Sequence, residues 1–259
     1  MRTNPVKDRL QNNQLVLGTM IFEFSTTGIG RIAAASGAEF VLFDMEHTGW
    51  SVETIRMLIA TSASAGTVPL VRIPATDYQF VARCLDMGAM GIMAPMVRDA
   101  EQARNLVDFA KYPPAGRRGG AFGISHDHYT GGSASEKMLS ANQETLLIAQ
   151  IETADGLSNV EEIAAVDGID VLWIGQTDLS NSLGIPGQFA HPDFKDAVQR
   201  VVDVARASGK AAGYMGMSIE ECQGLYEQGF RALAYSGDLW LYQEILAKGI
   251  STLRDQADG

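Results

Sequence analysis

The stretch Leu146–Gly156, LLIAQIETADG, decides how the rest of the sequence is interpreted. Four apolar residues at its start predict a buried strand, and Gln150 and Glu152 place an amide and a carboxylate at its end. A charge at the end of a buried strand is costly to desolvate unless a partner compensates it. The stretch therefore predicts a buried strand and raises the question of what Glu152 faces.

Eight apolar runs alternate with segments of helical periodicity. The runs are continuous, which is typical of parallel strands buried on both faces. Caps for helices are predicted at Asp77, Asp99 and Ser218, with a stop at Gly229. Eight repeats in 259 residues predict a (β/α)₈ TIM barrel that forms a single domain over residues 1–259. A doubly wound open sheet is the alternative, because periodicity does not establish closure. The predicted strands are residues 15–22, 40–45, 69–73, 91–97, 145–151, 171–175, 210–215 and 230–236.

Composition narrows the class of protein. The formal net charge of −11 argues against nucleic acid and anionic membrane surfaces, since both attract Lys and Arg. The polar N-terminus lacks the apolar core of a signal peptide, and no run of about 18 apolar residues could span a membrane. Cys84 and Cys222 have no metal-ligand spacing and fit a reducing compartment. The sequence therefore predicts a soluble cytoplasmic protein.

The long segment 113–144 is rich in glycine and polar residues. Because long connections in compact domains are often functional, we predict a βα loop here, with residues 117–132 setting substrate specificity. Its GRRGG motif (116–120) could bind an anionic substrate or form a salt bridge between subunits. Its SHDHY motif (125–129) favours a solvated loop over a metal site.

Polar residues recur at the ends of four predicted strands: Asp44 with Glu46 and His47, then Arg72, Glu152 and Asp178. Any one of them alone is more often a helix cap or an interior ion pair. Active sites of these barrels lie at the carboxyl ends of the strands, so four such groups at one rim predict a site.

The residue types indicate a metal-dependent mechanism. Glu152 and Asp178 form a pair of hard oxygen ligands that suits Mg²⁺ or Mn²⁺. His47 is the candidate general base, oriented by Asp44 or Glu46, with a core histidine bonded to backbone as the alternative. Arg72 on a buried strand requires an anion, either a neighbouring carboxylate or a substrate.

The lysines argue against a Schiff-base mechanism, which needs a lysine at the carboxyl end of a strand. Only Lys210 lies near a predicted strand, and it lies at the start of that strand.

Six motifs, in order, resemble those of the HpcH/HpaI aldolases, which are class II, metal-dependent pyruvate aldolases typified by 4-hydroxy-2-oxoheptanedioate aldolase. The motifs are FDMEHTGW (43–50), VRIP (71–74), LDMGAMGIMAPMV (85–97), KYPPAGRRG (111–119), AQIET (149–153) and IGQTDLSNSLG (174–184). The resemblance implies a barrel that assembles as a homohexamer, often with the last helix exchanged between subunits. It also implies reversible cleavage of a 4-hydroxy-2-oxo acid to pyruvate, or hydroxypyruvate, and an aldehyde through a metal-bound enolate. The implied cofactor is a divalent ion, Mg²⁺, Mn²⁺ or Co²⁺.

The resemblance also implies residue roles. Glu152 and Asp178 match the metal ligands, and His47 matches the base. Arg72 matches the arginine that contacts the keto acid, and Gln150 matches a residue that lines the pocket. The amides of Thr177 and Asp178 match those that bind the substrate carboxylate, and Asp44 and Asp86 match acidic residues that support the site. The sequence departs from the family at Met45, at Gln176 and over residues 121–132. An acyl-CoA lyase on the same barrel, or a non-catalytic barrel that binds a keto acid, are the competing functions. The histidine of DMEH argues against the first.

Overall fold

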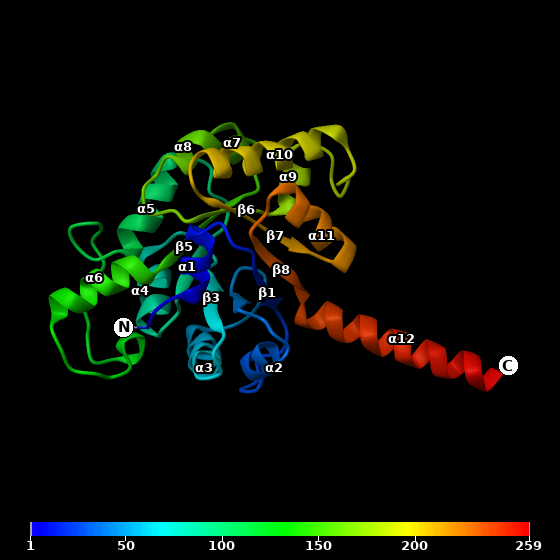
Figure 1. Cartoon of the computed structure of the whole chain (residues 1–259), viewed down its shortest axis with the longest axis horizontal. Helices are drawn as coiled ribbons and strands as arrows, with labels where there is room; N and C mark the ends of the chain where they lie inside the picture. Colours follow the sequence, from blue (N-terminus) through cyan, green and yellow to red (C-terminus); the bar gives the residue numbers. More distant parts are fainter. Residues whose placement is uncertain (1, 259) are drawn as a thin grey trace.

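The eight strands form a closed parallel barrel with the helices outside it (Figure 1). The structure is a computed structural model and describes residues 2–258. Each strand overlaps its predicted apolar run, and pairing of β1 with β8 closes the barrel and excludes the open sheet. The strands are β1 (Val16–Ile21), β2 (Phe40–Asp44), β3 (Val68–Arg72), β4 (Gly91–Ala94), β5 (Leu146–Ile151), β6 (Val171–Ile174), β7 (Ala211–Gly216) and β8 (Ala232–Gly237).

The predicted helix signals are confirmed. The side chains of Asp77, Asp99 and Ser218 accept hydrogen bonds from amides in the first turns of α4, α5 and α11, and Gly229 ends α11 with a φ of 114°. The helices are α1 (Pro5–Gln11), α2 (Ile29–Ala35), α3 (Val52–Ala63), α4 (Tyr78–Asp86), α5 (Ala100–Ala110), η1 (Ser125–Asp127), α6 (Ala134–Glu144), α7 (Ala154–Ser158), α8 (Val160–Ala164), α9 (Gln176–Ser182), α10 (Pro192–Ala207), α11 (Ile219–Gln228) and α12 (Asp238–Asp258).

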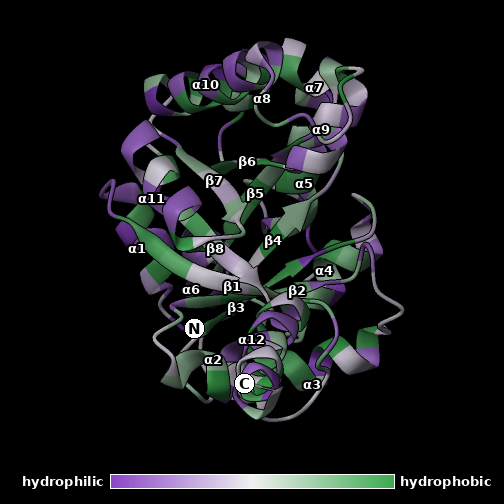
Figure 2. Cartoon of the chain, turned by 90° about the vertical axis from the view of Figure 1, so that its right-hand side faces the viewer, coloured by the Kyte–Doolittle hydropathy of each residue, from purple (hydrophilic) through white to green (hydrophobic). Residues whose placement is uncertain are grey.

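The strands bury both faces, which accounts for their continuous apolar runs. On β6, Val171 and Trp173 belong to the cluster inside the barrel, whereas Leu172 and Ile174 pack in the layer between strands and helices. Figure 2 shows strands β5 and β6 in the hydrophobic colour and hydrophilic residues along α10 outside them. This alternation aims every second residue of a strand into the barrel, including those at its carboxyl end.

Helix α12 leaves the barrel and ends far from it at the C-terminus (Figure 1). It exposes five large apolar side chains: Tyr242, Ile245, Leu246, Ile250 and Leu253. Within residues 2–258, no helix combines the length and apolar character needed to cross a membrane.

The prediction of a βα loop over residues 113–144 is wrong. The segment contains the short helix η1 and the helix α6, and it connects α5 to the start of β5. The Ser125 hydroxyl donates a hydrogen bond to the Met87 carbonyl, just before β4 begins. The segment therefore lies at the amino-terminal end of the barrel, opposite the strand ends that carry the polar residues.

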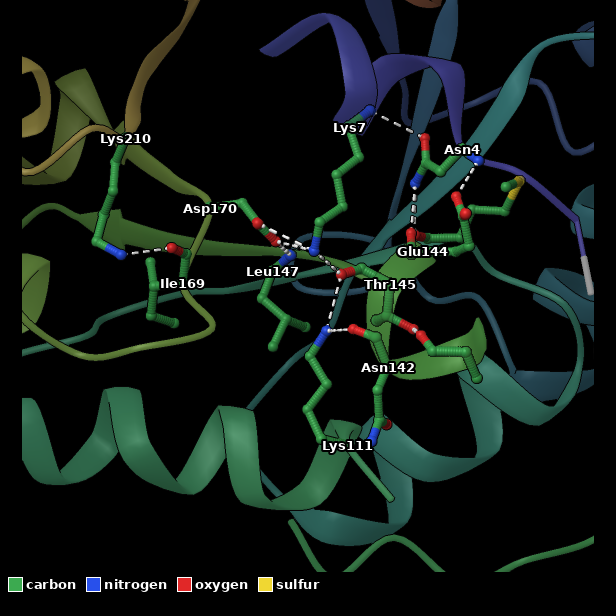
Figure 3. Close-up of polar contacts among 12 residues, drawn as sticks. Asn4, Lys7, Lys111, Asn142, Glu144, Thr145, Leu147, Ile169, Asp170 and Lys210 are labelled. Carbon is green, nitrogen blue, oxygen red and sulfur yellow. Dashed lines mark hydrogen bonds and ion pairs between the residues drawn. The ribbon is translucent and has the colours of Figure 1, made fainter. Parts of the chain in front are cut away.

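A buried polar cluster joins α1 to this amino-terminal end (Figure 3). The Lys7 ammonium donates to the Thr145 carbonyl at 2.7 Å and lies 3.0 Å from Asp170 Oδ1. Lys111 Nζ donates to the same Thr145 carbonyl at 3.1 Å. Burial, followed by the charge of Lys7, lowers the pKa of Lys111 to about 7. Asp170 is thus the carboxylate that acts on both lysines, and Lys111 is the lysine whose charged form is disfavoured.

Lys111→Met is expected to change how stability depends on pH. An unfolded lysine has a pKa of about 10.4, so between pH 7 and 10 the unfolded chain holds a proton that folded Lys111 has lost. The Lys111 contribution to the free energy of unfolding therefore rises with pH in this window, by up to about 1.4 kcal/mol per pH unit. Urea unfolding of both proteins from pH 7 to 10 measures this slope. Parallel curves for wild type and Lys111→Met would show that Lys111 is charged in the folded state.

Candidate active site

The carboxyl ends of β2, β3, β5 and β6 bring the predicted residues to one mouth of the barrel. Asp44 and Arg72 are register partners on adjacent strands. Gln150 and Trp173 are register partners on β5 and β6, and Glu152 and Asp178 follow the ends of these two strands. The fields of Arg72, Glu46 and Asp178 all act on Glu152, so the charged groups form one cluster.

Arg72 is held by two carboxylates. Its Nε–H donates to Asp44 Oδ1 at 2.6 Å, and its Nη1 lies 3.1 Å from Glu46 Oε2. Asp44 is fully buried and also accepts hydrogen bonds from the backbone amides of Glu46 and His47. A single carboxylate therefore orients the guanidinium and shapes the turn that carries His47.

Glu152, the residue whose partner was in question, is 1% exposed and accepts two hydrogen bonds. Its Oε1 accepts from the Met96 amide at 2.5 Å, and its Oε2 accepts from Gln150 Nε2 at 2.6 Å. Met96 has a φ of 54°, in the left-handed region that non-glycine residues rarely adopt. The pKa of Glu152 is raised to about 7, mainly by burial. The hydrogen bond from the Met96 amide lowers this pKa, whereas the charges of Glu46 and Asp178 raise it. This repulsion between carboxylates is what a cation would relieve.

The donors present fit a divalent cation. Glu152 and Asp178 provide carboxylate oxygens, which Mg²⁺ and Mn²⁺ prefer. A side chain at Gly175 would collide with Glu152 Oε2 and Gln150 Nε2, so this glycine allows the turn before Asp178 to approach Glu152. Across residues 2–258 no group of three or more His, Cys, Asp or Glu side chains is arranged for a metal. Glu152 and Asp178 would supply two ligands and leave positions for substrate and water.

His47 has an exposed imidazole at the mouth rather than a buried one bonded to backbone. Its Nε2 lies 3.7 Å from Glu46 Oε2, and its side chain is 57% exposed. Of the two acids expected to orient it, Glu46 is the one in reach, because Asp44 contacts only the His47 backbone amide.

Glu46 was predicted from the sequence only as a residue that could orient His47, and its contact with Arg72 was missed. It bridges Arg72 and His47, and its Oε2 is buried. Burial raises the pKa of Glu46, against the charges of Arg72 and His47. Its spacing of two from Asp44 was the available signal, because residues i and i+2 of an extended chain face the same side.

Asp86 does not join this group within one chain. It lies at the end of α4, where its Oδ1 is 2.5 Å from Nη2 of Arg118. In the GRRGG motif, Arg117 pairs with Asp108 of the same chain. In SHDHY, His126 and Asp127 are buried instead of solvated, and Asp127 pairs with Lys137. In one chain, residues 117–132 thus lie at the amino-terminal end of the barrel.

The fold and site together define a closed parallel barrel with a cluster of charged side chains at one mouth, and comparison with known proteins identifies the family. The model of the HpcH/HpaI aldolase/citrate lyase family matches residues 20–243. The chain therefore belongs to this family and is an enzyme, a carbon–carbon lyase of the aldolase type. The class II assignment made from the motifs agrees with the names of the similar proteins described next.

Three relatives illustrate the similarity. A 2-keto-3-deoxy-L-rhamnonate aldolase of Escherichia coli O17:K52:H18 is 30% identical over 257 residues, covering 99% of this chain and 96% of that protein. The crystal structure of an HpcH/HpaI aldolase from Desulfitobacterium hafniense DCB-2 has 34% identity and a TM-score of 0.93, covering 98% and 97% of the two chains. That of the citrate synthase SbnG has 30% identity and a TM-score of 0.87, covering 98% of each.

Proposed function

We propose that the enzyme reversibly cleaves a 4-hydroxy-2-oxo acid to pyruvate, or hydroxypyruvate, and an aldehyde. The observation that carries the proposal is the buried Glu152 carboxylate, which the Met96 amide and Gln150 Nε2 fix at the same mouth of the barrel as Arg72. This arrangement suits a substrate that brings an anion and shares a cation with the protein. The E. coli relative is named for a 2-keto acid, which supports the same donor chemistry.

Glu152 and Asp178 would hold the divalent cation, which we propose is Mg²⁺, Mn²⁺ or Co²⁺. When bound, the cation supplies Lewis-acid stabilisation of the negative charge that develops on the keto oxygen during cleavage. The Met96 amide and Gln150 Nε2 keep the Glu152 carboxylate in one orientation, so no reorganisation is needed when the substrate arrives.

The remaining residues bind and orient the substrate. Asp44 and Glu46 hold the Arg72 guanidinium, which hydrogen-bonds to the keto acid. The amides of Thr177 and Asp178, in the first turn of α9, bind the substrate carboxylate because such amides have no partner within a helix.

His47 moves the proton. Its exposed imidazole takes the proton of the C4 hydroxyl during cleavage, directly or through a water, and returns it during synthesis. Glu46, 3.7 Å from His47 Nε2, stabilises the imidazolium that forms. Lys210 takes no part, because its ammonium donates to the Val166 and Ile169 carbonyls at the other end of the barrel.

Proton NMR of pyruvate in D₂O tests this proposal without knowledge of the aldehyde. We expect the methyl signal to decay with Mg²⁺ or low Mn²⁺ present and to persist with EDTA, because exchange requires loss of a methyl proton to form the enolate. Hydroxypyruvate is tested alongside as the other donor. Folded protein that exchanges neither keto acid with any divalent metal would contradict the proposal.

The thioester lyase remains the second candidate because of the similarity to the citrate synthase SbnG. It predicts turnover of citramalyl-CoA or malyl-CoA, whereas the aldolase leaves both unchanged. The DMEH turn, with His47 beside Glu46, favours the aldolase.

We further propose that copies of the chain exchange α12 within a hexamer in the cytoplasm. A groove of about 730 Å³ lies beside α2 and α11, and its lining includes the exposed side chains of Leu17, Ile32, Ile219 and Tyr226. Ile245, Leu246, Ile250 and Leu253 of α12 are exposed in one chain, so a second copy of α12 in this groove would bury both surfaces. The two free cysteines suit a reducing compartment.

A further inference from the structure

The mouth of the barrel has two chemically different halves. The charged groups Asp44, Arg72 and Glu152 come from β2, β3 and the end of β5. On the other half, Phe22 after β1 and Met215 on β7 pack against the cluster inside the barrel and remain partly exposed. Met215 points into the barrel, because it lies four residues after Ala211 on β7 and residues at even spacing on a strand face the same side. Ala211 belongs to the cluster inside the barrel.

Phe22 marks the boundary between the two halves. Its ring centroid lies 5.9 Å from the Arg72 guanidinium carbon. Its ring packs edge-on against Trp240, with 5.0 Å between centroids. Gln176 donates a hydrogen bond to the Met215 carbonyl at 3.1 Å and so ties β7 to the turn that carries Asp178. A substrate held between Arg72 and Asp178 would extend over Phe22 and Met215.

Basic residues are scarce around the mouth. The segments that join strand ends to the next helices are residues 22–28, 45–51, 73–77, 95–99, 152–153, 175 and 217–218, and their only basic residues are His47 and Arg98. Arg72, on the end of β3, already binds two carboxylates. The segments after β1 and β7 contain no Lys, Arg or His, and β8 runs directly into α12. Asp238 adds a further negative charge there, bound by three backbone amides.

We propose that the acceptor aldehyde is uncharged and that its carbon chain lies over Phe22 and Met215. This inference rests on the proposed aldolase function and names the substrate class of the same site. A second carboxylate on the aldehyde would be desolvated over an apolar surface, in the field of the carboxylates of the mouth. On this side of the mouth, the segments after β1 and β7 offer it no basic side chain. An alkyl or hydroxyalkyl chain would bury apolar area there instead.

Two matched pairs of compounds test the proposal on the Mg²⁺-loaded enzyme. Butanal and succinic semialdehyde have the same length and differ by one carboxylate, and we expect kcat/KM with pyruvate to be about 30-fold or more higher for butanal. The dead-end analogues 2-oxoheptanoate and 2-oxoheptanedioate differ in the same way and cannot be cleaved. We expect calorimetry to show tighter binding of the monocarboxylate, by about tenfold or more.

Added charge provides the mutational test. Met215→Arg is expected to shift the kcat/KM ratio toward succinic semialdehyde by about tenfold, and Met217→Arg, on the segment after β7, serves if the first variant does not fold. Leu139→Arg adds the same charge on exposed α6 at the other end and should leave the ratio unchanged.

Equal use of the two aldehydes, with equal binding of the two analogues, would overturn the inference while leaving the aldolase function intact. Failure of the function itself would appear separately, as absence of pyruvate exchange.

Discussion

Glu152→Gln is expected to lower metal-dependent aldol cleavage by about 10³-fold or more while the protein stays folded. The amide has the shape of the carboxylate, and its oxygen can still accept the hydrogen bond from the Met96 amide. What it removes is the negative charge that the cation would share with Asp178. Burial already raises the pKa of Glu152, so loss of this charge should not destabilise the fold. Steady-state kinetics and Mn²⁺ titration by calorimetry measure the two effects.

The matched control is Glu220→Gln, which makes the same chemical change on an exposed residue in the first turn of α11. It should retain wild-type turnover and metal affinity. Turnover of Glu152→Gln within threefold of wild type would refute the assignment of Glu152 as a metal ligand.

Removal of residues 244–259 is expected to convert the assembly into single chains. The truncation keeps Asp238, whose carboxylate binds the amides of Phe22, Glu23 and Phe24, so the mouth of the barrel is preserved. It deletes most of the exposed apolar stripe of α12, which would bind in the groove of a second copy. Light scattering during size-exclusion chromatography measures the mass, which should fall to that of one truncated chain.

The control substitutes the opposite face of α12. Lys248→Ala with Asp255→Ala lies about half a turn away from Leu246 and Leu253, and should leave the mass unchanged. If wild type and truncation both have the mass of a single chain, α12 has another role and the proposed exchange is wrong.

The strands were predictable because each buries both faces and so leaves a continuous apolar run, as residues 171–174 show. Closure was not predictable from any run, since it depends on pairing of Val16–Gly18 with Ala232–Ala234 at the far end of the chain. Helix α6 was missed because only Lys137 and Ala141 of its residues are buried. A helix with so small a buried face has no apolar stripe in its sequence.

The candidate site was predictable to the extent that strand order places Asp44, Arg72 and Glu152 at one mouth. The contacts between them were not, because they depend on side-chain geometry across strands. The Met96 amide is the clearest case. No sequence rule places a methionine at positive φ, yet this conformation directs its N–H to Glu152. Asp86, which the family motif suggested, lies in one chain at the end of α4, where it pairs with Arg118.

Helix α1 has a consequence for how the chain reaches its fold. Lys7 binds a carbonyl 138 residues later and a carboxylate 163 residues later. Helix α1 therefore lacks these docking partners until the chain through Asp170, which precedes β6, has been synthesised. Until then, Val6 and Leu10, which later fill the bottom of the barrel, remain exposed on a nascent segment. Such non-local contacts slow folding, so we expect α1 to dock on the amino-terminal end of the barrel late in folding.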